Sequence, residues 1–109
     1  DFYRLGHDAI LVLCDDFQLP TGTIRLRASG SAGGQNGLAD VLSRLAATGV
    51  PRLRIGIGPV PAEWKTADFV LARFPKDERE SVTAALERAA DAAEEWVALG
   101  IEAAMNRYN

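Results

Sequence analysis

The spacing of hydrophobic and polar residues differs from segment to segment, and each spacing indicates an element. Residues 8–14 (DAILVLC) are almost continuously apolar and are followed by Asp15 and Asp16. Such a run is typical of a strand that is buried on both faces. In residues 23–28 (TIRLRA), polar and hydrophobic residues alternate strictly. This alternation predicts a half-exposed strand that carries two arginines on one face.

Helical spacing begins after a loop of small residues. The leucines and the valine of residues 38–45 lie at positions i, i+3, i+4 and i+7, which predicts an amphipathic helix. Gly49 and Pro51 provide the signal that ends this helix. Residues 53–58 (LRIGIG) predict a third strand, and two prolines within residues 59–65 predict a loop.

The remainder of the chain is predicted to be helical. Residues 67–74 predict a short helix, and apolar residues at helical spacing predict a long alanine-rich helix over residues 82–97. Gly100 is expected to break or bend this helix before residues 101–108. The predicted order is therefore strand, strand, helix, strand, loop, helix, helix, which indicates an α/β layer arrangement. Within it, residues 23–58 could form a right-handed strand–helix–strand crossover.

The composition is that of an ordinary soluble globular domain. The 109 residues suffice for one compact domain and not for two, and 48% are hydrophobic while 25% are charged. No apolar run is long enough to cross a bilayer, and the first ten residues lack the pattern of a signal peptide. The single cysteine, Cys14, excludes an internal disulfide, suits the reducing cytoplasm and is more typical of a packing residue than of a nucleophile.

The charges are unevenly distributed along the chain. Residues 21–54 contain five arginines and one aspartate, whereas acidic residues dominate from Lys76 onward. The net charge of −3 argues against indiscriminate binding of nucleic acids, but a basic middle segment could still form a local face for a polyanion. The charges alone leave a second interpretation open, in which they merely solvate the strands around them.

The paired aspartates are the first candidates for chemistry. Asp15 and Asp16 are expected just past the C-terminal end of the first strand, where ligands gather in open α/β sheets. A carboxylate at that place can orient a histidine or hold a metal. Aspartate is also common in ordinary turns, so the spacing leaves a purely structural interpretation open.

A second candidate is the glycine loop, which we define as residues 29–34. Residues 30–37 (GSAGGQNG) open the predicted helix, and their small side chains let a backbone approach a ligand closely. Asn36 could cap the helix or direct its amide at a substrate. The spacing is neither that of a P-loop nor that of a dinucleotide fingerprint. No cluster of histidine, cysteine and carboxylates has metal-ligand spacing, so no metal is expected.

Four blocks of sequence, in order and with near-normal spacing, resemble the bacterial-type peptidyl-tRNA hydrolases. They are ILVLCDDFQLPTG at 10–22, RLRASGSAGGQNGL at 25–38, PRLRIGIG at 51–58 and AAEEW…AMNR at 92–107. The combination is specific, although no single block is. The resemblance implies an α/β fold in which a mixed sheet is sandwiched by helices. It also implies hydrolysis of the ester between a peptide and tRNA in the cytoplasm, without a metal or cofactor.

The resemblance also assigns roles to single residues. Asp15 matches the aspartate that orients the family's catalytic histidine, and Asn36 matches the asparagine that positions water or substrate. Arg25, Arg27 and Arg54 match basic positions that contact tRNA phosphates. An aspartate–histidine pair suits ester hydrolysis, because it fixes the tautomer of the imidazole base and stabilises the imidazolium.

The glycine-rich segment departs from the family at one position. Gly33, Gly34 and Gln35 match residues that hold the substrate, but the family has a histidine where this chain has Gln35. Glutamine keeps a donor and an acceptor but does not titrate near neutrality, so a proton or pH role at this position is lost. Residues 59–65 match the mobile loop that covers the family's cleft.

The resemblance further implies a partial domain. The family's catalytic histidine belongs to a segment that precedes these residues, so residues 1–109 are expected to form a single partial domain that does not hydrolyse peptidyl-tRNA alone. An open strand edge and apolar face predict self-association, or completion by that N-terminal segment. Two alternatives stay open: a non-catalytic RNA-binding relative, like the chloroplast splicing cofactors that this family resembles, and an α/β fragment held by packing alone.

Overall fold

The computed structural model describes most of the chain, namely residues 6, 9–32, 36–45, 49–58 and 78–109. Within them the elements follow in the order β1 (Val12–Pro20), β2 (Ile24–Arg27), α1 (Asn36–Leu45), β3 (Arg52–Gly58), α3 (Arg79–Leu99) and α4 (Ile101–Tyr108). This is the order of strands and helices that the hydrophobic spacing predicts. The loop expected at 59–65 and the short helix expected at 67–74 lie outside the described residues.

Among the described residues the strands form a three-stranded mixed sheet. Strand β3 lies between the other two, parallel to β1 and antiparallel to β2. The parallel crossover expected over residues 23–58 is therefore wrong. The tight turn at Thr21 and Gly22 reverses the chain after β1, so a strand that runs parallel to β1 must run antiparallel to β2. The parallel pair is β1 and β3.

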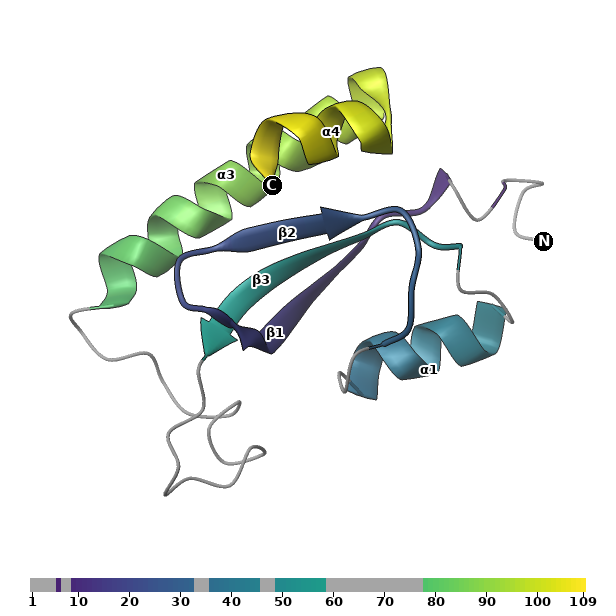
Figure 1. Cartoon of the computed structure of the whole chain (residues 1–109), viewed down its shortest axis with the longest axis horizontal. Coiled ribbons are helices and arrows are strands. Elements are labelled where there is room, and N and C mark those ends of the chain that lie inside the picture. The colour runs from purple at the N-terminus through teal and green to yellow at the C-terminus, as the bar shows by residue number, and fades with distance from the viewer. Residues whose placement is uncertain (1–5, 7–8, 33–35, 46–48, 59–77) are drawn as a thin grey trace.

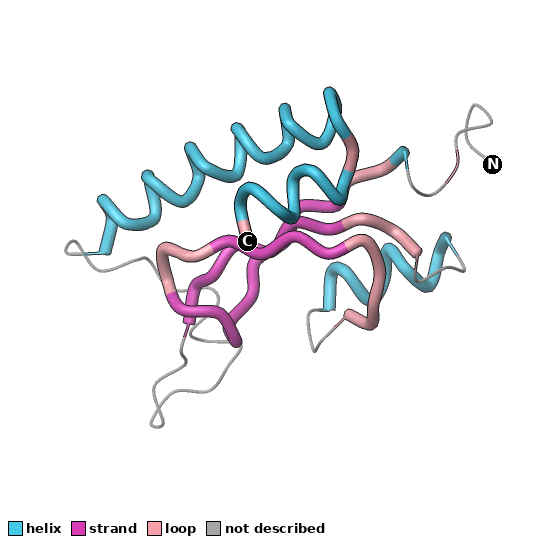
Figure 2. The backbone as a smooth tube through the Cα atoms, turned by 45° about the horizontal axis from the view of Figure 1, so that its top comes forward, coloured by secondary structure: helices cyan, strands magenta, loops and turns pink. Residues whose placement is uncertain are grey.

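Helices cover both faces of this sheet. Figure 1 shows α3 and α4 along one face and α1 against the other, and Figure 2 shows the same layers from another angle. The long helix α3 ends at Gly100, whose φ of 92° lies in the left-handed region that favours glycine. The predicted break at Gly100 and the predicted mixed sheet between helices are both confirmed.

The larger core lies between the sheet and the two C-terminal helices. Ile24 and Leu26 of β2 are buried in it, while Arg25 and Arg27 are exposed, as the alternation predicts. Leu53 of β3 pairs in register with Leu26 and faces the same core. Small side chains on α3 and α4 let these helices lie close to the sheet, and they are Ala85, Ala89, Ala92 and Ala104.

A smaller core lies between α1 and the opposite face of the sheet. Leu38 and Leu42 of α1 are buried there together with Val50, and Val12 and Cys14 of β1 pack against them. Cys14 is half-buried, as expected of a packing residue. Because side chains alternate along a strand, Val12, Cys14 and Asp16 of β1 share this α1 face with Arg52 and Arg54 of β3.

Strand β1 differs from its prediction. It begins at Val12 and continues to Pro20, so Asp15 and Asp16 lie inside the strand and not after it. The prediction ended the strand at the first polar side chains, but a strand forms through its backbone ladder with β3, which polar side chains do not interrupt. Leu13 is 53% exposed, so β1 is also not buried on both faces within the described structure.

Two glycines of β3 explain how β1 continues beyond the aspartates. The pairing shifts register between Asp16 and Pro20. At Gly56 and Gly58, a β-carbon would overlap the carbonyl oxygens of Pro20 and Phe17. The missing side chains therefore let the two backbones approach closely. As a result, β1 stays beside β3 from the aspartates to Pro20, directly before the turn that leads to β2.

Candidate functional site

A cavity of about 350 Å³ opens between β1 and the start of α1. Asp15 lines it from β1, and Gly37 and Leu38 line it from the first turn of α1. The other lining residues are Val12, Leu13, Cys14 and Val41. Helix α1 begins at Asn36, directly before Gly37. The fold therefore brings Asp15 near the first turn of the helix that begins at Asn36.

The two neighbouring aspartates have different surroundings. Asp15 pairs in register with Ile55, which packs against the larger core, so strand alternation sends Asp16 to the α1 face. Asp16 is only 5% exposed. Its carboxylate accepts hydrogen bonds from the main-chain N–H of Gln18 at 2.8 Å and from Nη1 of Arg54 at 3.2 Å. Asp16 is thus bound within the fold, and Asp15 is the aspartate at the cavity.

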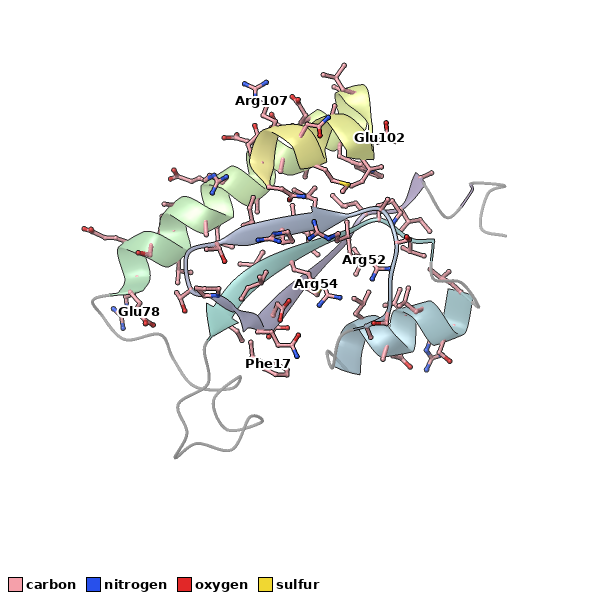
Figure 3. The ribbon with its side chains drawn as sticks, in the orientation of Figure 1. Phe17, Arg52, Arg54, Glu78, Glu102 and Arg107 are labelled. Carbon is pink, nitrogen blue, oxygen red and sulfur yellow. The ribbon has the colours of Figure 1, made fainter. Side chains whose placement is uncertain are left out.

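Two arginines of β3 hold the first part of the glycine loop. Arg52 Nη1 and Arg54 Nη2 both donate to the carbonyl oxygen of Ser31, each at 3.0 Å. Arg52 also donates through Nε to the carbonyl oxygen of Val50 at 2.9 Å, and it is completely buried. Figure 3 shows both side chains reaching from β3 towards the segment that links β2 with α1. We term Arg52, Arg54 and the Ser31 carbonyl the arginine bracket.

Arg52 is the member of this bracket to which the sequence pattern assigns no role. The signal that could have found it is the alternation of residues 52–54 (RLR), because positions i and i+2 of a strand share a face. What the pattern does not show is that this face meets the glycine loop. That contact depends on the sheet order, which sets β3 between β1 and β2.

The antiparallel register extends the basic face from β3 to β2. Arg25 lies opposite Arg54 and Arg27 lies opposite Arg52, and residues directly opposite each other share a face of the sheet. Arg25 and Arg27 are exposed, whereas the Arg54 side chain is 14% exposed. The predicted phosphate-binding arginines are therefore adjacent, but only the two on β2 are open to solvent. The other predicted substrate-binding residues lie outside the described residues, and they are Gly33, Gly34 and Gln35.

Burial changes the titration of two side chains on this face. It raises the pKa of the Cys14 thiol; the Arg54 charge opposes this shift, and the two aspartates add to it. A raised thiol pKa keeps Cys14 neutral near pH 7, which makes it a poor nucleophile. Burial also lowers the pKa of Arg52, as does the neighbouring Arg54 charge. Arginine nevertheless stays charged in proteins, so the site keeps its positive character.

The part of the chain that the structure describes contains neither a metal-binding cluster nor a membrane-spanning helix. Within this part of the chain, no group of three or more His, Cys, Asp or Glu side chains could hold a metal ion. Over the same residues, no helix combines the length and the apolar character needed to cross a membrane. Every buried side-chain nitrogen or oxygen in the described structure has a hydrogen-bond partner.

Comparison with known proteins identifies the family. The family model described as peptidyl-tRNA hydrolase matches residues 1–109. The chain belongs to the peptidyl-tRNA hydrolase family. Membership confirms the resemblance of the four sequence blocks to this family. The mixed sheet between helices is also the fold that the resemblance implies.

Individual peptidyl-tRNA hydrolases match the chain over nearly all of its length. The chain is 51% identical over 109 residues to that of Rhodopirellula baltica and 52% identical over 108 residues to that of Symbiobacterium thermophilum. These alignments cover 100% and 99% of this chain and 57% of each relative. A crystal structure of the Acinetobacter baumannii enzyme matches with a TM-score of 0.88 and 32% identity, over 99% of this chain and 55% of that one. The chain thus spans little more than half the length of these relatives.

Proposed function

We propose that this chain is the part of a peptidyl-tRNA hydrolase that holds the tRNA end of the substrate, and that the complete enzyme cleaves the ester between peptide and tRNA. The observation that carries this proposal is the cavity at which Asp15 meets the first turn of α1. Family membership supports the choice of substrate. In this proposal the complete enzyme recycles stalled peptidyl-tRNA during translation and acts in the cytoplasm.

The proposed chemistry needs a base that deprotonates water and donors that stabilise the oxyanion of the tetrahedral intermediate. Asp15 would orient a histidine base which, by the family resemblance, belongs to another segment of the complete enzyme. Asn36, the first residue of α1, would position water or the substrate carbonyl. Gly33, Gly34 and Gln35 would hold the substrate end beside it. The resemblance implies no metal or cofactor for this reaction.

The backbone of tRNA is proposed to lie along β2. Arg25 and Arg27 are exposed on one face of that strand, and contacts from arginine to phosphate supply much of the affinity for nucleic acids. Arg54 lies deeper, and its guanidinium already binds Asp16 and the Ser31 carbonyl. Its contribution to tRNA binding in this proposal is the positive potential beneath the two exposed arginines.

One residue favours a second function. Gln35 stands where the family has a histidine, so this chain lacks a titratable side chain at that position. A relative that keeps the fold and the arginines but has lost hydrolysis would be a non-catalytic RNA-binding protein. Both functions require RNA binding, and they differ in whether the complete protein hydrolyses peptidyl-tRNA.

The test measures tRNA binding and ester hydrolysis by the same purified chain. We expect the chain to bind deacylated tRNA with an affinity that falls as salt rises. In an Arg25→Gln, Arg27→Gln double variant, the slope of log affinity against log salt should fall by about 2, roughly one for each lost phosphate contact. We expect no release of peptide from peptidyl-tRNA by the 109 residues alone, with a full-length relative as the positive control.

The matched control removes the same charge from the opposite side of the sheet. Arg79 and Arg88 are exposed on α3, so an Arg79→Gln, Arg88→Gln double variant should keep the salt slope of the parent chain. Equal slopes in the two double variants would contradict binding along β2. Measurable turnover by the parent chain would contradict the expected inactivity of these residues alone.

We also propose that the outer edge of β1 is covered in solution, either by a second copy of the chain or by the N-terminal segment of a complete protein. In the described structure β1 pairs with β3 and lies at the edge of the sheet. Leu13, on this strand, is 53% exposed. An edge strand with exposed apolar surface promotes association with another chain.

A further inference from the structure

The arginine bracket joins β3 to the glycine loop at a single atom. Arg52 and Arg54 donate to the same carbonyl oxygen, that of Ser31. Hydrogen bonds from a charged donor are roughly twice as strong as neutral ones, so two of them on one oxygen fix its position strongly. Ser31 is itself exposed, and its place in the molecule is therefore set by these contacts more than by packing of its own side chain.

Arg52 donates hydrogen bonds to main-chain carbonyl oxygens. It is completely buried, so a phosphate in solution does not reach it. Burying a guanidinium is costly unless its N–H groups have acceptors. The carbonyl oxygens of Val50 and Ser31 provide these acceptors at 2.9 and 3.0 Å. Both acceptors are main-chain atoms in segments that adjoin α1, one after the helix and one before it.

Asp16 fixes Arg54, the second arginine of the bracket. Its side chain is 7% exposed and accepts from Arg54 Nη1 at 3.2 Å. Because a guanidinium is planar and rigid, holding Nη1 at Asp16 aims Nη2 at Ser31, where the distance is 3.0 Å. The network therefore links β1, β3 and the glycine loop. Asp15, which precedes Asp16 on β1, lines the cavity at the start of α1.

We propose that Arg52 and Arg54 are positioning residues, which act through the Ser31 carbonyl to hold residues 29–32 of the glycine loop, and with them the approach to α1, where substrate binding requires them. This assigns a role to Arg52 and moves Arg54 from a phosphate contact to a support of the loop. The consequence for tRNA binding rests on the proposed function, whereas the anchoring itself is a property of the chain. Lysine cannot replace either residue, because one ammonium group lacks the fixed fork of a guanidinium.

Nitrogen-15 relaxation tests the anchoring without RNA. Arg52→Lys and Arg54→Lys keep the charge but remove the fork. In the parent chain we expect amide order parameters near 0.85 at Ala32 and Gly37, as in a rigid backbone, and in either variant values below about 0.6. The amide of Ala89 in α3 should keep its order parameter, because that helix packs on the opposite face. Such a pattern distinguishes local release of the loop from general loosening of the fold.

The control is Arg44→Lys on α1. Arg44 contacts Asp40 at 3.0 Å, and both side chains are largely exposed, so this variant should leave all order parameters unchanged. Low order parameters at Ala32 in the parent chain would overturn the proposal, as would unchanged values in both bracket variants. If Arg52→Lys fails to fold, Arg54→Lys decides the question, because that side chain is partly exposed.

Binding of deacylated tRNA separates positioning from phosphate contact. We expect Arg54→Lys to weaken binding at least fivefold, whereas a lysine would satisfy a simple phosphate contact and leave affinity nearly unchanged. We expect Arg54→Gln to weaken binding while lowering the salt slope by much less than 1, because only its potential is lost, whereas a lost phosphate contact would lower the slope by about 1. If the parent chain binds no tRNA, the proposed function fails, and the order parameters still decide whether the bracket anchors the loop.

Discussion

At the scale of single residues, alternation along β1 gives two adjacent aspartates separate surroundings. Asp16 is buried against Arg54, and its carboxylate is engaged within the fold. Asp15 lines the cavity beside the start of α1. Sequence alone shows the pair, and the family resemblance selects Asp15. The register between β1 and β3 decides the face that each carboxylate occupies, and it places the Asp16 carboxylate on the α1 face beside Arg54.

Cys14 provides a prediction about pH at the same scale. Burial raises the pKa of its thiol above that of an exposed cysteine, and the thiolate is the reactive form. We therefore expect iodoacetamide to alkylate Cys14 at least tenfold more slowly at pH 8 in the folded chain than in the urea-unfolded chain. Equal rates in the two states would contradict the burial of this thiol.

The same shift has a consequence for stability. Because the pKa is higher in the folded state, the unfolded chain loses this proton first, and stability falls as pH rises through the pKa of the unfolded thiol. Urea denaturation at pH 7 and pH 10 measures the loss. A Cys14→Ala variant is the comparison, because it lacks this titration and should lose less stability over that interval than the parent chain.

At the scale of elements, the pairing of β1 with β3 depends on glycines at the point of closest approach. Gly58→Ala would place a β-carbon on the carbonyl oxygen of Phe17, and the backbone there would have to move. We expect the free energy of unfolding to fall by about 1–3 kcal/mol, the usual range for overpacking, as measured by urea denaturation. Gly49→Ala is the control, because no heavy atom lies within 4 Å of a β-carbon there. Equal stability of the two variants would contradict this close approach.

Periodicity predicts an element well when one face of that element is buried. It gives β2, α1 and β3 near their observed bounds, and the long helix with its break at Gly100. It fails for β1, because the ladder with β3 continues through Asp15 and Asp16, residues that are also typical of turns. It also fails for strand direction, because the antiparallel pairing of β2 and β3 follows from the insertion of β3 beside β1. Both failures concern tertiary pairing, which local spacing does not encode.

At the scale of the whole molecule, the proposed site draws on every strand of the described sheet. Asp15 comes from β1, the exposed arginines from β2 and the bracket from β3, while α1 begins at Asn36. Local patterns identify the aspartates and the glycine loop as candidates, and the proposal that they belong to one site rests on the family resemblance. The chain spans 57% of the Rhodopirellula baltica relative. We therefore propose that the histidine base lies in the part of a complete enzyme that this chain does not span.

The outer edge of β1 allows a test of how whole chains associate. We expect light scattering to give the mass of a dimer at micromolar concentration, because β1 is an edge strand of the described sheet and Leu13 is 53% exposed. In a symmetric dimer the same surface occurs twice at the interface, so Leu13→Glu would bring like charges together and should yield a monomer. Val97→Glu is the control on α3, where the side chain is 77% exposed, and it should leave the mass unchanged. A monomeric parent chain would contradict association through this edge, and so would equal dissociation by the two variants.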